Sequence, residues 1–112
     1  MAKMTVLEQT TTLVNESFEM GIVEMPDSEE ALLLVLSARI EEMLGQKPEF
    51  LMSLLYRLDV LEVKIKPVMH PLAPEPAHIG LARLVLERQK QRAETKKSII
   101  TKPLQDAEDW NW

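Results

Sequence analysis

SEEALLLVLSARIEEMLG, the stretch at residues 28–45, decides the fold of this chain. Its serine can accept hydrogen bonds from the free amides of a helix start, and the two glutamates that follow suit the positive end of the helix dipole. Its second half places apolar and charged positions at helical spacing, and Gly45 can adopt the left-handed conformation that ends many helices. The stretch therefore predicts a helix over residues 28–44.

The first half of this helix is apolar on every side, because residues 31–36 read ALLLVL. A helix on the surface of a monomer needs only one apolar stripe, so the apolar side chains outside that stripe must be covered by other helices or by a second copy of the chain. We expect a homodimer, and Leu32 and Leu34 are the residues that we expect at its interface.

Three further helices are predicted, over residues 48–58, 60–69 and 76–97. Pro48 suits a first helical turn, and Asp59 with Glu62 three residues later resembles a capping box for the third helix. The sequence therefore predicts an all-α fold, a three- or four-helix bundle. The expected buried positions are Leu33, Leu36, Ile40, Leu54, Leu55, Leu58 and Leu84.

Two segments flank the helical domain, which we place at residues 26–97. Residues 1–25 show no clean period: positions between Val6 and Val14 could line one helical face, but Thr10–Thr12 is a poor helix sequence, so we expect an irregular arm. Residues 20–25 could form a short strand. Residues 98–112 form a tail that is acidic at its end.

Composition limits the possible functions. A length of 112 residues suits one domain, and the absence of cysteine excludes disulfides, zinc-thiolate sites and thiol nucleophiles. The apolar run at residues 31–36 is much shorter than the roughly 20 residues that cross a bilayer, so we expect a cytoplasmic protein without a membrane anchor. None of the three glycines lies in a phosphate-binding pattern. We expect no enzymatic activity and no cofactor or metal.

Two groups of residues are candidate sites. His70 and His78 lie in or beside a proline-rich connection, at a spacing that matches no helical ligand pair, and are expected to be ordinary surface histidines. Tyr56, Arg57 and Asp59 interrupt a leucine-rich segment. Asp59 as a helix cap, Arg57 paired with a nearby carboxylate and Tyr56 half-buried would explain them without a ligand. A small-molecule pocket is the alternative.

Charge is segregated along the chain, although the net charge is only −5. Residues 1–50 hold three Lys or Arg against ten Asp or Glu, whereas residues 80–102 hold seven against two. The basic helix, with Arg88 and Arg92 as its expected contacts, could bind the acidic half of the same or another chain. It could also touch nucleic acid, but no RNA-binding signature or helix-turn-helix accompanies it. Protein interaction, as an adaptor or regulatory subunit, is therefore the leading hypothesis, and a nucleic-acid-associated protein is the alternative.

Both tryptophans of the chain, Trp110 and Trp112, stand behind acidic residues in the tail. Such a segment can anchor in an apolar groove with a basic rim, either on a partner protein or on the chain's own helices.

Two segments carry a resemblance to other proteins. The segments LLYRLDV at residues 54–60 and LVLERQKQR at residues 84–92 resemble a pattern in short, uncharacterised bacterial helical proteins. The resemblance spans roughly residues 30–97. It implies a helical fold and a bacterial origin, and it carries no function with it.

Overall fold

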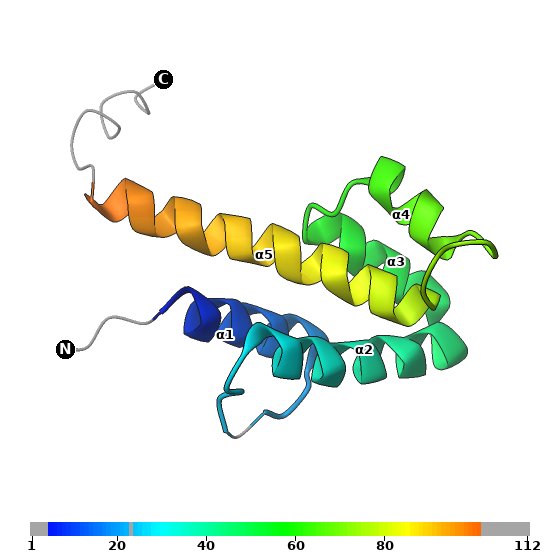
Figure 1. Cartoon of the computed structure of the whole chain (residues 1–112), viewed down its shortest axis with the longest axis horizontal. Coiled ribbons are helices and arrows are strands. Elements are labelled where there is room, and N and C mark those ends of the chain that lie inside the picture. The colour runs from blue at the N-terminus through cyan, green and yellow to red at the C-terminus, as the bar shows by residue number, and fades with distance from the viewer. Residues whose placement is uncertain (1–4, 23, 102–112) are drawn as a thin grey trace.

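The computed structural model describes residues 5–22 and 24–101 of the chain. These residues form five α-helices and no strand (Figure 1). The all-α prediction is therefore confirmed, and the possible strand at residues 20–25 is not present among the described residues. The helices are α1 (Val6–Phe18), α2 (Glu29–Gln46), α3 (Pro48–Arg57), α4 (Glu62–Met69) and α5 (Ala77–Thr101).

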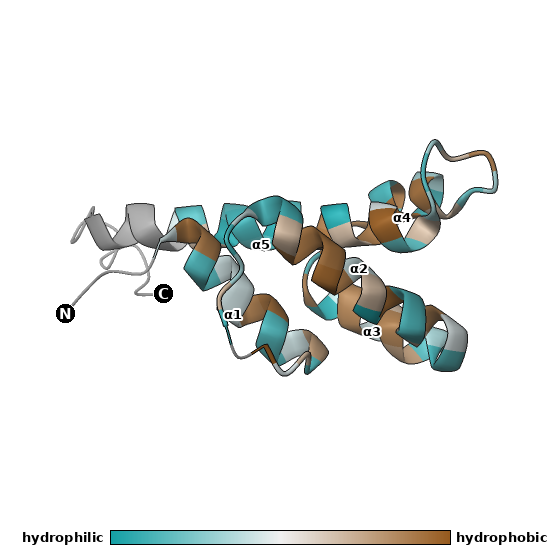
Figure 2. Cartoon of the chain, turned by 60° about the horizontal axis from the view of Figure 1, so that its bottom comes forward, coloured by the Kyte–Doolittle hydropathy of each residue, from teal (hydrophilic) through white to brown (hydrophobic). Residues whose placement is uncertain are grey.

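The long helix α5 organises the bundle, because it packs against α1, α2 and α4 (Figure 1). Helix α2 packs in turn against α3 and α1. Apolar residues of all five helices meet between them, and the first turns of α2 are among the most apolar parts of the ribbon in Figure 2. The fully buried residues of this core include Val14, Leu32, Leu36, Ile40, Leu51, Leu55, Leu81 and Val85.

The expectation of an irregular N-terminal arm is wrong for residues 6–18, which form α1. Thr5 and Glu8 make a capping box: the Glu8 amide donates to the Thr5 hydroxyl at 3.1 Å, and the Thr5 amide donates to the Glu8 carboxylate at 2.9 Å. Val14 and Phe18 are buried against the rest of the chain. This packing outweighs the poor helix propensity of the threonines, and Thr11 satisfies its hydroxyl on the Leu7 carbonyl.

Helix α2 begins as predicted and ends later. Ser28 is its N-cap, and the Ser28 hydroxyl accepts a hydrogen bond from the Ala31 amide at 3.1 Å. Gly45 does not end the helix: it lies within the last turn, and the C-cap is Lys47, whose backbone is neither helical nor left-handed. The chain can therefore pass directly into α3, for which Pro48 supplies the predicted first residue.

Asp59 does not cap α4, although its spacing from Glu62 predicts a capping box. Its backbone is left-handed, with φ at 65°, and it follows the C-cap of α3. The Asp59 amide donates to the Tyr56 carbonyl and the Val60 amide donates to the Leu55 carbonyl, each at 3.0 Å. These two bonds are the Schellman motif, in which Asp59 holds the position usually given to glycine and Val60 turns into the core. The N-cap of α4 is Leu61, without a side-chain bond.

The predicted core is largely confirmed. Six of its seven residues are buried, from Leu33 on α2 to Leu58 after α3. Leu84 is only half-buried, because it lies at the rim of the bundle and faces a hollow beside α4. Helix α5 also continues beyond the predicted end at residue 97 to Thr101.

Candidate interaction surfaces

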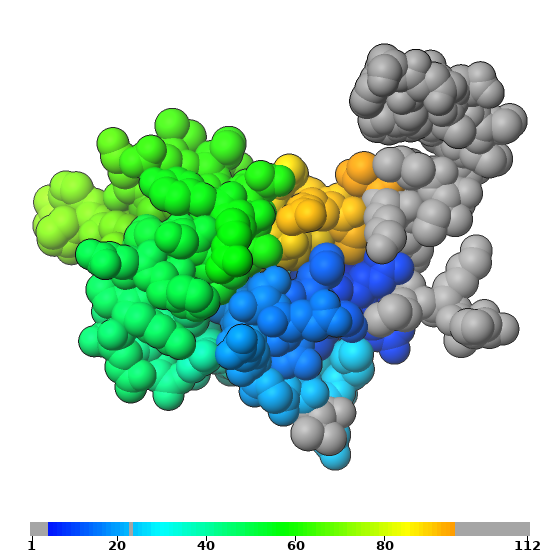
Figure 3. Space-filling view, turned by 180° about the vertical axis from the view of Figure 1, so that it is seen from behind, coloured from blue at the N-terminus to red at the C-terminus, as the bar shows by residue number. Residues whose placement is uncertain are grey.

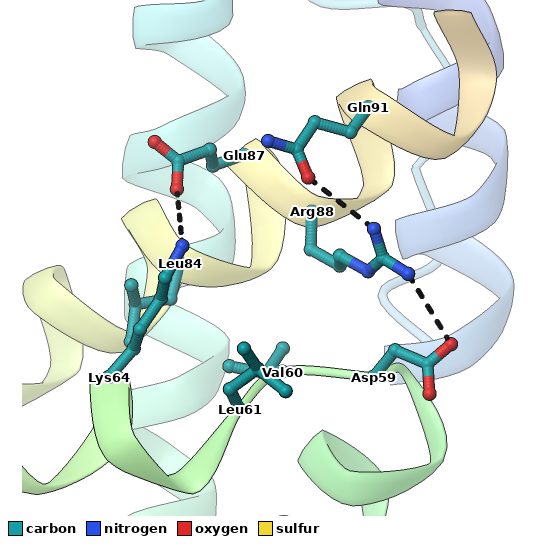
Figure 4. A pocket seen from close by; sticks show the side chains of 8 residues that line it. All are labelled: Asp59, Val60, Leu61, Lys64, Leu84, Glu87, Arg88 and Gln91. Atoms are coloured by element: carbon teal, nitrogen blue, oxygen red, sulfur yellow. Dashed lines mark hydrogen bonds and ion pairs between the residues drawn. The ribbon is translucent and has the colours of Figure 1, made fainter. Parts of the chain in front are cut away.

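A hollow of about 370 Å³ opens between α4 and α5 (Figure 4). We call it the α4–α5 hollow. One wall is the turn after α3 with the start of α4, and the other is the solvent-facing side of α5. Its lining combines apolar and charged side chains: Asp59, Val60, Leu61, Lys64, Leu84, Glu87, Arg88 and Gln91.

A buried hydrogen bond fixes the two walls against each other. Gln89 is 1% exposed, and its side-chain amide donates to the Leu58 carbonyl at 3.1 Å. Because a buried amide without a partner is costly, this bond holds α5 in register with the turn that carries Asp59 and Val60. Sequence reasoning missed Gln89, since a glutamine among charged residues reads as part of a solvated helix face.

Two ion pairs lie across the hollow, and both are long. Lys64 lies 3.7 Å from Glu87, and Arg88 lies 3.7 Å from Asp59 (Figure 4). At this separation the charges attract, but the geometry of a hydrogen bond is lost. The cations of the hollow therefore keep donor positions open.

The open donor positions are clearest at Arg88. One terminal nitrogen donates weakly to Gln91 at 3.4 Å, while its Nε is buried and has no hydrogen-bond partner in the structure. Buried donors in proteins are usually paired, so an unpaired guanidinium nitrogen marks a place where an acceptor is missing.

A second surface is the outer face of α2, which we define as Ala31, Leu34, Val35 and Ala38. These positions follow helical spacing, and the face turns away from the buried side. Leu34 is 65% exposed and Val35 is 46% exposed. Leu32, the other leucine predicted at an interface, is fully buried among the chain's own helices, so Leu34 is the one of the two that a partner can reach.

The three polar residues at the α3–α4 junction do not line one pocket. Asp59 lies in the α4–α5 hollow, whereas Arg57 lies on the other side, in a shallow hollow between α1 and α3. There the Arg57 guanidinium is 5.9 Å from the centre of the Phe50 ring. Figure 3 shows α1 and α3 side by side on this face. Tyr56 is exposed rather than half-buried.

The basic helix is partly neutralised within the chain. Lys90 pairs with Glu29 of α2 at 2.9 Å, and Arg83 pairs with Glu75 at 2.9 Å. The hydrogen bond and the charge of Glu29 raise the pKa of Lys90. The basic C-terminal half and the acidic N-terminal half thus meet inside one chain at this position. Arg92 is exposed and donates to Gln89 at 3.4 Å.

The remaining candidate residues are the two histidines and the two tryptophans. His70 follows α4, where its Nδ1 accepts a hydrogen bond from the Leu72 amide at 3.0 Å, and His78 is half-buried in the first turn of α5. Within residues 5–22 and 24–101, His, Asp and Glu form no group of three that could hold a metal ion. Trp110 and Trp112 lie outside the described residues.

Comparison with known proteins gives no family for this chain. No family model matches it, and neither the curated proteins nor the solved structures contain a match. The resemblance to short bacterial helical proteins therefore stays a prediction. No helix in the described part of the chain is long and apolar enough to cross a membrane.

Proposed function

We propose that the chain is a cytoplasmic protein-interaction module, an adaptor or a regulatory subunit, that acts as a homodimer through the outer face of α2. The observation that carries the proposal is the exposure of Leu34 in the first half of α2, which is apolar on every side in the sequence. The chain's own helices cover one side of α2 and leave this face open.

Burial of this face would contribute favourable free energy to a dimer. Full burial of a leucine contributes about 1.5 to 3 kcal/mol, so covering the exposed part of Leu34 contributes roughly 1 to 2 kcal/mol for each copy. The small residues Ala31 and Ala38 on either side let a second helix approach closely. A two-fold interface uses the same face of both copies and doubles this gain.

A pair of variants tests the proposal. Leu34→Glu places a charge on the outer face of α2, and Leu72→Glu places the same charge on another exposed leucine, in the connection between α4 and α5. Neither side chain is part of the core, so both variants should keep the helical circular dichroism of the parent. Light scattering should then give a lower mass for Leu34→Glu only. Equal masses for both variants and the parent would refute the interface.

The alternative, contact with nucleic acid through α5, is carried by the exposure of Arg92 and by the basic run around it. Lys90 speaks against it, because it already pairs with Glu29 of its own chain at 2.9 Å. We expect no retardation of duplex DNA or RNA at physiological salt. If binding is seen, replacing Arg88 and Arg92 by Ala should reduce the slope of log affinity against log salt, and that result would favour the alternative.

A further inference from the structure

The α4–α5 hollow has the chemistry of a peptide-binding site. Leu61 and Leu84 give it apolar walls, while Lys64 and Arg88 at its rim each face a carboxylate of the hollow at 3.7 Å, Glu87 and Asp59 respectively (Figure 4). Its volume of about 370 Å³ is enough for one large aromatic side chain. The apolar walls fit an aromatic side chain, and carboxylates beside it would compete with Asp59 and Glu87 for the two cations.

The chain itself contains such a segment. Residues 106–112 read DAEDWNW, with three carboxylates directly before two tryptophans. We propose that this segment binds in the α4–α5 hollow of its own chain. An indole ring fits between the apolar walls and can stack against the Arg88 guanidinium, and the carboxylates can accept from the terminal nitrogens of Arg88, whose present contacts with Gln91 and Asp59 are long, at 3.4 and 3.7 Å.

The segment is long enough to reach the hollow. Thirteen residues of helix separate Arg88 from Thr101, which is about 20 Å at the rise of an α-helix. The nine residues from Thr101 to Trp110 span up to about 30 Å when extended. The returning chain would pass Arg92, which is exposed and carries a further positive charge.

A tethered segment also has an advantage over a second copy. A short linker holds a ligand at an effective concentration in the millimolar range, well above micromolar protein. The long ion pairs of the hollow also favour docking, since at 3.7 Å neither cation makes a hydrogen bond to the carboxylate that it faces.

Tryptophan fluorescence of the full chain tests this directly, because its only tryptophans are in the segment. We expect emission at a shorter wavelength than that of a tryptophan derivative in water, together with protection from quenching by acrylamide. Leu61→Glu should abolish both effects, and so should Lys64→Glu. Val63→Glu is the matched control: Val63 is exposed on the same helix but does not line the hollow, so the parent emission should be kept.

Three results would overturn the proposal, provided that circular dichroism shows each variant to be folded. Emission of the parent chain like that of free tryptophan in water would mean that the segment does not dock. Emission that moves to longer wavelength on dilution would mean that a second copy holds the segment. Emission unchanged in both Leu61→Glu and Lys64→Glu would mean that it docks elsewhere.

Discussion

Gly80 lies in the first turn of α5, where that helix packs against Val68 of α4. A Cβ at this position would lie 2.8 Å from the Val68 Cβ and 3.2 Å from its Cγ1. Because the Val68 Cβ is attached to the backbone, relief requires movement of a helix rather than of a flexible side chain. Gly45, in the last turn of α2, is the control, since a Cβ there would meet nothing within 4 Å.

Replacing each glycine by Ala separates helix propensity from packing. Alanine stabilises a helix by about 1 kcal/mol relative to glycine, and less near an end. Overpacking costs about 1 to 3 kcal/mol. Gly45→Ala should therefore raise the free energy of unfolding by up to about 1 kcal/mol, whereas Gly80→Ala should lower it by up to about 2 kcal/mol.

Urea denaturation followed by far-ultraviolet circular dichroism measures both changes. The free energy of unfolding should fall with urea concentration at the same slope in the parent chain and the two variants, so that the midpoints can be compared directly. If Gly80→Ala stabilises the chain as much as Gly45→Ala, then Val68 of α4 does not pack closely against Gly80 of α5. That result would contradict the placement of α4 as a wall of the α4–α5 hollow.

Further substitutions test single contacts. Gln89→Met keeps the volume but leaves the buried Leu58 carbonyl without its donor, and should cost about 1 to 3 kcal/mol in denaturant titration. Ser28→Ala removes the N-cap bond of α2 and should cost about 1 kcal/mol, and no change in the midpoint would speak against the cap. Lys90→Met removes the pair with Glu29; because folding raises the pKa of Lys90, the difference from the parent should be present at neutral pH and vanish as the pH rises through that raised pKa. A difference that grows at alkaline pH would refute the assignment of this pair.

The helices α2 to α5 could be predicted because their signals are local. Ser28 starts α2 and Pro48 starts α3 as expected, and periodic leucines identify the buried side of α3. Asp59 shows the limit of such signals. An acid with Glu62 three residues later fits a helix start, but here the acid adopts a left-handed conformation that ends the preceding helix.

Contacts between residues far apart in the chain determine helix α1, the α4–α5 hollow and the orientation of α2. Helix α1 is held by burial of Val14 and Phe18, which a run of threonines does not reveal. The α4–α5 hollow brings Lys64 to Glu87, and no spacing in the sequence indicates that approach. In the first half of α2, residues 31–36 include no polar side chain, so Leu32 inside and Leu34 outside could not be told apart from these residues.

The mass of the unmodified chain in solution tests the proposed dimer most directly. Light scattering over a wide range of concentrations should give twice the mass of one chain, and high salt should not reduce it, because apolar burial on α2 rather than ion pairing holds the copies together. A mass of one chain at every concentration would contradict the proposal.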